Sequence, residues 1–216
     1  MRKKTTKKTE DRILSAAIEL FVRNGFHGTS IDDIMSKVGF TKGAFYSHFD
    51  GKDQLFMKLL EEYRFYFIGG LTSAIEHPEG NALDKLHRIV SFLSRFATEN
   101  TDLCVFLTFL TTELNTNADF EPAIKSIYLE YQKIVSGVIR QGQKQRILKK
   151  DLDPDLAALT FMSLHDGVLH QWTLHRQYID GEAFVRTFRE IFLNGLVCPD
   201  AAEKVSVEKI RAGRAG

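Results

Sequence analysis

The stretch TKGAFYSHFDGKDQL, residues 41–55, places two phenylalanines four positions apart, next to a tyrosine and a histidine. Residues four apart share one face of a helix, so Phe45 and Phe49 are predicted to face inward. The outward face then carries Lys42, Gly43, Tyr46, Ser47 and His48. The stretch is too short to form a domain core, and its pattern predicts a surface that meets a partner.

The residues before this stretch predict a helix-turn-helix. Ser30, followed three residues later by Asp33, is a capping box, and it starts a helix whose apolar stripe ends at Gly39. Thr41 is expected to cap the helix that follows. Glycine in the turn can take the left-handed conformation that other residues resist. A longer helix is expected ahead of the motif, over residues 10–24.

The charge of the chain is unevenly distributed. Residues 1–52 hold ten Lys and Arg against six Asp and Glu, a net of +4, whereas the remaining residues carry a net of −3. A basic head suggests contact with a polyanion such as nucleic acid. A solubilising tail is the alternative, because five of the positive charges lie within the first eight residues.

Composition excludes several other classes. No apolar run reaches the roughly 20 residues that a membrane span needs, and the basic first ten residues lack the apolar core of a secretory signal. The two cysteines, Cys104 and Cys198, lie far apart. They fit a reducing cytoplasm better than a disulfide framework.

Beyond Asp50-Gly51 the sequence predicts helices almost throughout. Pro154 fits the first turn of one of them, with Asp153 as its cap. A loop is expected at residues 77–81, and a polar tail at 199–216. The expected helices cover residues 52–75, 83–98, 103–114, 121–145, 154–175 and 182–197.

Residues 10–55 resemble the DNA-binding domain of TetR/AcrR-type transcriptional regulators. The resemblance rests on ILSAAIELFVRNGFHGTSIDDIMSKVGFTKGAFYSHFDGKDQL, with its AA-x-x-LF run, its Gly-x-x-x-Thr-Ser step and its Lys-Gly-x-Phe-Tyr-x-His-Phe segment. It implies an all-α protein with an N-terminal three-helix helix-turn-helix domain and a larger C-terminal helical domain for ligand binding and dimerisation. The implied boundaries are 1–51, with a flexible basic arm at 1–9, then 52–198, then the tail 199–216.

The resemblance also implies a set of DNA-contacting residues. Lys42 and Lys52 suit phosphate groups, Gly43 lets the helix start approach DNA closely, and Tyr46 offers a hydroxyl and a ring. The implied set is Thr29, Ser30, Thr41, Lys42, Gly43, Tyr46, His48 and Lys52. Ser30 and Thr41 also serve as helix caps, and Tyr46 and His48 also fit packing within the domain.

One such domain contacts too few base pairs for specific binding, and a dimer matches two reading helices to a palindrome. The family pattern makes a homodimer through the last two helices, and the partner is a palindromic operator in double-stranded DNA. The implied dimer residues are Phe184, Phe188, Ile191 and Phe192. Packing within the chain is the alternative for each.

The family's C-terminal domain usually encloses a small-molecule pocket, and aromatic side chains with a few polar groups suit one. The candidate ligand residues are Phe92, Phe96, Leu107, Leu110, Tyr128, Tyr131, Met162, His165 and Trp172. A filled core is the alternative. In the segment DGVLHQW, Asp166 or Gln171 serves a ligand or ties helices together.

Three function classes follow from these patterns. The leading hypothesis is a ligand-responsive regulator, a repressor released from its operator when a small apolar or aromatic effector binds. The alternative is an architectural DNA-binding protein without a small-molecule ligand. An enzyme is not expected, because no glycine loop, nucleophile elbow or carboxylate pair is recognisable. No cofactor and no metal site are expected: His165, His170 and His175 are five apart, and on one helix they cannot chelate a single ion.

Overall fold

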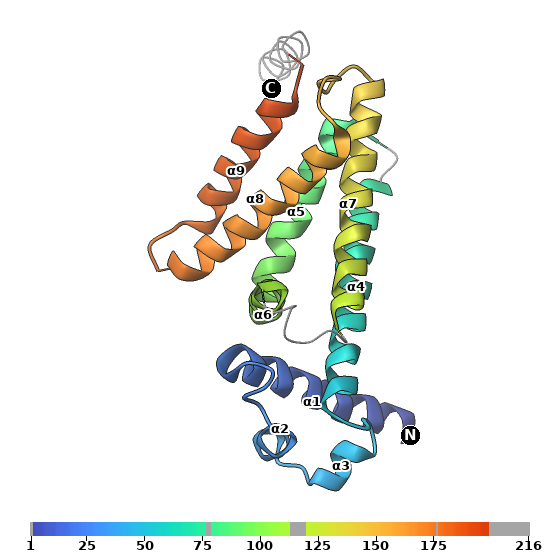
Figure 1. Cartoon of the computed structure of the whole chain (residues 1–216), viewed down its shortest axis with the longest axis vertical. Helices are drawn as coiled ribbons and strands as arrows, with labels where there is room; N and C mark the ends of the chain where they lie inside the picture. Colours follow the sequence, from blue (N-terminus) through green and yellow to red (C-terminus); the bar gives the residue numbers. More distant parts are fainter. Residues whose placement is uncertain (1, 77–78, 113–119, 176, 199–216) are drawn as a thin grey trace, which may run out of the picture. The chain divides into compact units, whose positions relative to one another are not determined.

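The computed structural model describes residues 2–76, 79–112, 120–175 and 177–198, with the side chains of residues 2–6 and 108–112 excepted. All regular secondary structure in these ranges is helical, which confirms the predicted fold class (Figure 1). No helix in these ranges is both long and apolar enough to cross a membrane. The helices are α1 (Arg2–Asn24), α2 (Ile31–Val38), α3 (Lys42–Tyr46), α4 (Lys52–Glu76), α5 (Ala82–Glu99), α6 (Thr101–Thr112), α7 (Glu121–Lys144), α8 (Pro154–His175) and α9 (Gly181–Leu196).

The chain forms two compact units. Unit 1 comprises residues 1–67 and 97–127, and unit 2 comprises residues 68–96 and 128–216. The expected boundary at 51/52 differs from this division, because the first part of α4, all of α6 and the start of α7 belong to unit 1. The polar tail expected at 199–216 lies outside the described residues.

A cluster of five phenylalanines gives the physical reason for that boundary. Phe21 of α1 stacks on Phe106 of α6 with ring centroids 5.5 Å apart, and Phe56 of α4 lies 4.3 Å from Phe120, just before α7. Phe26 lies 5.2 Å from both Phe56 and Phe120. All five side chains are buried. Because these rings come from α1, α4, α6 and the start of α7, those elements share one core. We call these five residues the aromatic cluster.

Two predicted elements at the N-terminal end differ from the structure in where they begin or end. α1 begins at Arg2, so residues 2–9, expected as a flexible arm, are helical; no glycine or proline in this stretch stops the helix. α3 ends at Tyr46, and the turn Ser47–Phe49 continues its path with backbone hydrogen bonds.

Unit 2 is held together by close helix contacts. A Cβ atom at Gly70 of α4 would lie 2.1 Å from the ring of Phe92 in α5, so any larger residue there would force this ring to move. Phe161 of α8 packs on Phe188 and Phe192 of α9, with ring centroids 5.6 and 5.2 Å apart. The predicted cap of α8 is confirmed, because the amides of Asp155 and Leu156 donate to the Asp153 carboxylate at 2.8 and 2.9 Å.

The loop between α7 and α8 fastens the end of α9. The amide of Lys149 donates to the Leu196 carbonyl at 2.9 Å, and the amide of Cys198 donates to the Ile147 carbonyl at 3.0 Å. This pair of backbone bonds forms an isolated bridge between Leu148 and Val197. The bridge fixes the end of α9 to this loop within unit 2.

Candidate nucleic-acid interface

The exposed face of α3 is the candidate nucleic-acid interface. The predicted inward residues are confirmed: Phe45 is fully buried, and Phe49 is nearly so. The opposite side leaves Thr41, Lys42 and Gly43 exposed, together with Tyr46, whose side chain is 52% exposed. Local sequence therefore positions α3 by its apolar residues and leaves a mixed basic and aromatic face open.

The turn before α3 is set by glycine. Gly39 ends α2 in the left-handed conformation, at φ 71°, and its amide donates to the carbonyls of Met35 and Ser36. The left-handed conformation costs other residues about 1 kcal/mol or more. Gly39 therefore fixes the angle at which α3 leaves α2.

Lys42 reaches the protein surface but is already paired. Its ammonium lies 3.0 Å from the Asp32 carboxylate, and this pairing raises the pKa of Lys42. Both side chains are more than half exposed, so the ion pair exchanges readily with water or with a phosphate. Lys42 is therefore available to DNA at the cost of releasing Asp32.

The two expected helix caps behave differently. Ser30 completes the capping box: the Asp33 amide donates to the Ser30 hydroxyl at 3.1 Å, and the Ser30 amide donates to the Asp33 carboxylate at 2.8 Å. These bonds lower the pKa of Asp33. Thr41 occupies the cap position of α3, but its hydroxyl makes no capping bond, which corrects that expectation. The Thr41 hydroxyl is thus not committed to the helix.

Two residues of the implied DNA-contacting set form hydrogen bonds with backbone carbonyls of the same unit. Thr29 is 1% exposed, and its hydroxyl donates to the carbonyls of Leu20 and Gly25. The ammonium of Lys52 donates to the carbonyls of Phe26 and Thr29 at 2.6 and 2.8 Å. It also lies 4.4 Å from the centre of the Phe26 ring. The Thr29 side chain is therefore structural, which corrects the expectation that it contacts DNA. Lys52 is only partly buried, and its contact with DNA stays a prediction.

His48 and Gly43 lie beside the exposed face of α3 that carries Lys42 and Tyr46. His48 is half-buried, with its ring 6.2 Å from that of Phe49. An added Cβ at Gly43 would meet only the Thr41 hydroxyl oxygen, at 3.9 Å. Packing within the chain therefore does not require glycine at position 43, and its close approach to DNA stays a prediction.

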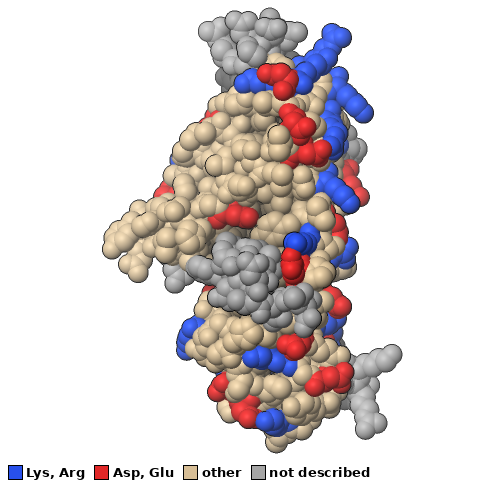
Figure 2. Space-filling view, viewed as in Figure 1, with Lys and Arg blue, Asp and Glu red and all other residues tan. Residues whose placement is uncertain are grey.

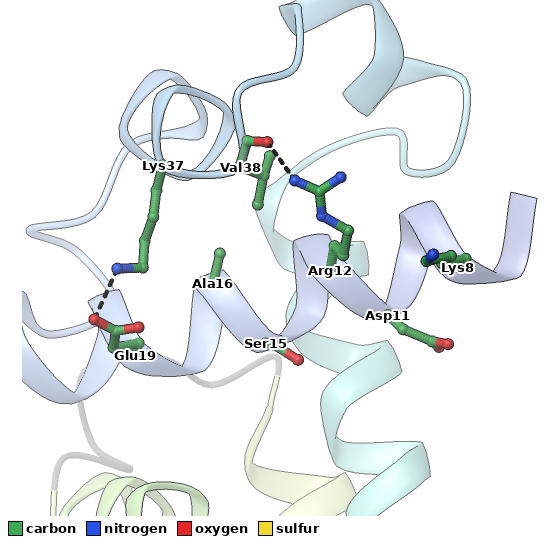
Figure 3. A pocket seen from close by; sticks show the side chains of 8 residues that line it. All are labelled: Lys8, Asp11, Arg12, Ser15, Ala16, Glu19, Lys37 and Val38. Atoms are coloured by element: carbon green, nitrogen blue, oxygen red, sulfur yellow. Dashed lines mark hydrogen bonds and ion pairs between the residues drawn. The ribbon is translucent and has the colours of Figure 1, made fainter. Parts of the chain in front are cut away.

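Arg12 is a structural residue that the sequence patterns did not single out. Its guanidinium donates to the Val38 carbonyl at 2.8 Å (Figure 3). It also lies 4.4 Å from the centre of the Phe40 ring. Arg12 thereby ties α1 to the turn before α3. No local signal pointed to this role, since the partners lie 26 residues or more away in sequence.

An open cleft of about 390 Å³ lies beside Arg12, between α1 and α2. Figure 3 shows the Lys37 ammonium pointing to the Glu19 carboxylate across one end, a separation of 2.7 Å. Lysine, arginine and acidic side chains alternate around the cleft, and both signs of charge also intermingle on the face of unit 1 seen in Figure 2. The residues that line the cleft are Lys8, Asp11, Arg12, Ser15, Ala16, Glu19, Lys37 and Val38.

The structure brings together part of the expected ligand set. Tyr131 and Met162 are buried in unit 2. The ring of Tyr131 lies 6.2 Å from the ring of His165. The Tyr128 hydroxyl lies 3.5 Å from the carboxylate of Asp166. In the same unit, the ring of Phe92 lies 5.5 Å from that of Phe96, and the Trp172 indole packs on Gly181. Leu107 belongs to unit 1, and the side chain of Leu110 lies outside the described residues.

The expected dimer residues divide into two groups. Phe188 and Phe192 are buried against Phe161 of the same chain, which corrects their assignment to an interface. Phe184 is half-buried, and Ile191 is exposed. α8 exposes leucines that the sequence patterns did not single out, because its hydrophobic residues are distributed around the whole helix. These exposed leucines are Leu156, Leu159, Leu164 and Leu174.

Comparison with known proteins identifies the class to which this fold and this face belong. Residues 13–59 match the family model for bacterial regulatory proteins of the tetR family. The chain is a DNA-binding transcriptional regulator of the TetR family. The match covers all of α2 and α3 and the start of α4.

Individual relatives extend the similarity beyond the helix-turn-helix. The chain is 23% identical over 188 residues to the fatty acid metabolism regulator protein of Bacillus subtilis, covering 86% of this chain and 94% of the relative. It is 25% identical over 210 residues to the transcriptional regulator AcrR of Shigella flexneri, covering 91% and 94%. Among solved structures, the MbdR regulator from Azoarcus sp. CIB is 28% identical, with a TM-score of 0.77 over 87% of this chain and 98% of that one.

A further solved structure is similar in fold. FadR from Bacillus subtilis, in complex with stearoyl-CoA, has a TM-score of 0.74 and 24% identity, over 86% of this chain and 98% of that one. No group of three or more His, Cys, Asp or Glu side chains suited to a metal ion occurs among the described residues.

Proposed function

We propose that the protein is a repressor that binds a palindromic operator in double-stranded DNA as a homodimer and acts in the cytoplasm. The observation that carries the proposal is the exposed face of α3, on which Lys42 and Tyr46 stand over the buried Phe45 and Phe49. A short helix with this face fits a major groove about 12 Å wide. Thr41, Gly43 and His48 flank it, and Ser30 lies at the exposed start of α2.

The dimer is proposed to form through α8 and α9. Leu156 and Leu159 are three residues apart on an exposed face of α8, and small residues at Ser163 and Gly167 continue that face. Ile191 offers a further exposed apolar side chain on α9. The surface around the turn between α8 and α9 is largely uncharged in Figure 2. Exposed apolar area of this kind favours burial against a second copy.

The effector is proposed to be a small apolar or aromatic molecule bound by unit 2. Two observations support this: aromatic rings of unit 2 pair within α5 and between α7 and α8, and a relative of the same fold was solved with stearoyl-CoA. Binding lowers the affinity for DNA only if the effector binds the released state more tightly than the DNA-bound state. Fatty acyl compounds are therefore the first class to test.

The experiment is a titration of the full chain against fluorescent DNA from the region upstream of its own gene. We expect affinity for one palindromic fragment to exceed that for a scrambled fragment of equal length and composition by about 10³-fold or more. Adding stearoyl-CoA or a shorter acyl compound is expected to release the palindrome. Equal affinity for both fragments, with a steep salt dependence, would favour the architectural DNA-binding protein instead.

A further inference from the structure

Helix α7 ends at an arginine whose backbone conformation usually belongs to glycine. Arg146 has φ 59°, and it is the only residue other than glycine with a positive φ in the part of the chain that the structure describes. Its amide donates to the Gln143 carbonyl at 3.1 Å, and the amide of Ile147 donates to the Gly142 carbonyl at 3.0 Å. These two bonds form a Schellman motif, whose left-handed residue is most often glycine. Arginine at this position therefore destabilises the fold relative to glycine.

The loop that follows this arginine is held firmly on unit 2. Leu148 is 1% exposed, and its neighbours Ile147 and Lys149 make the two backbone bonds to the end of α9. The side-chain amide of Gln143 donates to the carbonyls of Lys149 and Leu152 at 2.9 and 2.8 Å. The loop therefore presents its side chains from a fixed backbone, which reduces the conformational entropy lost when a partner binds.

Three exposed cations lie in and beside this loop: Lys144, Arg146 and Lys150. We call these three residues the basic loop patch. Among the described residues, no ion pair includes any of the three. On the face seen in Figure 2, Lys and Arg side chains gather where α7 ends, at the upper right. The patch therefore carries positive charge that the chain itself does not use.

The acidic side chains nearby are mostly engaged within the chain. Asp155 is paired with Arg140, and Asp153 accepts the capping bonds from the first amides of α8. Asp151 is exposed next to Lys150. One exposed carboxylate against three exposed cations leaves the surface with a net positive charge.

The dipole of α7 explains only a part of this arrangement. Lys144 lies in the last turn of α7, where a cation stabilises the helix end. The dipole gives no reason for a left-handed arginine at position 146, because glycine would end the helix with less strain. A strained residue that the fold does not need points to a function outside the fold.

The chemistry of the patch fits the phosphates of DNA. Guanidinium and ammonium groups both bind phosphate oxygens. Leu152, at 36%, is the only large exposed apolar side chain between residues 140 and 153, whereas a segment that binds a membrane surface presents several beside its cations. A regulator bound to DNA also meets further duplex at high effective concentration. A second segment of DNA is therefore the partner that the patch favours.

We propose that the basic loop patch binds the phosphate backbone of a second DNA segment while the α3 face holds the first. Such contacts depend on charge and are indifferent to base sequence. The protein would thereby bridge two duplexes, or two sites on one duplex. The proposal rests on DNA binding by the α3 face, and it adds a second DNA-binding surface on unit 2.

The test is a bridging experiment with the full-length protein at low salt. A biotinylated random-sequence duplex on beads is loaded with protein and washed, and a fluorescent duplex of another random sequence is then added. We expect the wild-type protein to retain the fluorescent duplex. The double variant Arg146→Gly with Lys150→Gln is expected to need about tenfold more protein for equal retention, with a slope of log affinity against log salt shallower by about two.

The matched control removes two exposed lysines from earlier turns of α7. Lys125→Gln with Lys133→Gln loses the same charge, and it is expected to retain the fluorescent duplex as the wild-type protein does. Direct anisotropy titration with one duplex is expected to give the same affinity for all three proteins within about twofold. If the patch variant fails to fold, Lys144→Gln with Lys150→Gln takes its place.

The single variant Arg146→Gly separates a functional arginine from a structural one. Because glycine adopts the left-handed conformation without strain, we expect its melting temperature to rise by about 2–4 °C. Its retention of the second duplex is expected to fall. A lower melting temperature with wild-type retention would make Arg146 a structural residue and overturn the proposal.

The remaining outcomes also decide the question. The proposal is overturned if the wild-type protein retains no second duplex, or if the folded patch variant retains as much as the wild type. Binding to vesicles of phosphatidylglycerol and phosphatidylcholine through the patch, without retention of DNA, would identify a lipid surface instead. If the patch variant loses bridging but single-duplex affinity is indifferent to sequence, the second surface stands and the proposed repressor function fails. If one palindrome is bound specifically without bridging, the repressor stands and the second surface fails.

Discussion

Two lysines that look equivalent in sequence have opposite surroundings. Lys42 is exposed and paired with a carboxylate that a phosphate can replace, whereas Lys52 donates to two backbone carbonyls. Burial lowers the pKa of Lys52, while the neighbouring Asp32 raises that of Lys42. Residue type alone therefore does not decide which lysine reaches DNA.

The first prediction separates these two lysines. Lys42→Met is expected to weaken operator binding, because one phosphate contact is lost. The slope of log affinity against log salt is expected to become shallower by about one. Lys52→Met is expected to lower the melting temperature and to keep the slope of log affinity against log salt. Anisotropy titrations at several salt concentrations, with thermal melts of each variant, measure both. A reduced slope for Lys52→Met alone would reverse the assignment.

The second prediction concerns the buried hydroxyl of Thr29. Thr29→Val keeps the shape of the side chain but removes the donor to the Leu20 and Gly25 carbonyls. We expect the free energy of unfolding to fall by about 1–2 kcal/mol. Urea denaturation of Thr29→Val and of the exposed control Thr41→Val measures the difference. A Thr29→Val protein of wild-type stability but weaker DNA affinity would contradict the structural role.

Helix α2 depends on a titratable cap. The bonds from Ser30 lower the pKa of Asp33, so the stabilisation it gives is fully present above the ordinary aspartate pKa, about 4. It is lost as the pH falls through the lower pKa of the folded state. We therefore expect Asp33→Asn to remove a part of the acid sensitivity of α2. Chemical shifts of the α2 amides, followed between pH 6 and pH 2, report the change, and identical titrations of both proteins would argue against the cap.

Helix α6 belongs to the DNA-binding unit through the aromatic cluster. Phe106→Ala opens a cavity beside the rings of Phe21 and Phe56, and we expect the free energy of unfolding of unit 1 to fall by about 3–5 kcal/mol. The matched control is Phe65→Ala on α4, since Phe65 is 72% exposed. Denaturant unfolding and amide exchange in α1 and α4 measure the effect. Equal stability of the two variants would show that α6 does not support this unit.

At the scale of the whole molecule, the proposed dimer rests on exposed leucines of α8. Leu159→Glu is expected to convert the dimer to a monomer and to weaken operator binding by about 10²-fold or more, because a monomer contacts only one half-site. The control is Leu129→Glu on α7, where the leucine is 53% exposed. Sedimentation velocity gives the oligomeric state of each. A dimeric Leu159→Glu protein would move the interface away from α8.

The sequence predicted much of the fold because its signals were local. The Ser30–Asp33 capping box, Gly39 and Pro154 mark helix ends, and the structure places α2 and α8 at the expected bounds. Phe45 and Phe49 were placed correctly because a four-residue spacing on a helix fixes their common face. The bounds of the other long helices differ from expectation by a few residues, apart from the extension of α1 to Arg2.

The local sequence determined where the helices form and which face of α3 is apolar, and its family motif determined the class of the protein. Tertiary structure decided the roles that depend on distant partners: the carbonyls that hold Lys52, the two backbone acceptors of Thr29 and the burial of Phe188 and Phe192 against Phe161. It also assigned α6 to unit 1 and placed the Asp166 carboxylate beside Tyr128 and His165. Helix signals act over a few residues, whereas burial and hydrogen-bond partners depend on segments tens of residues apart that only folding brings together.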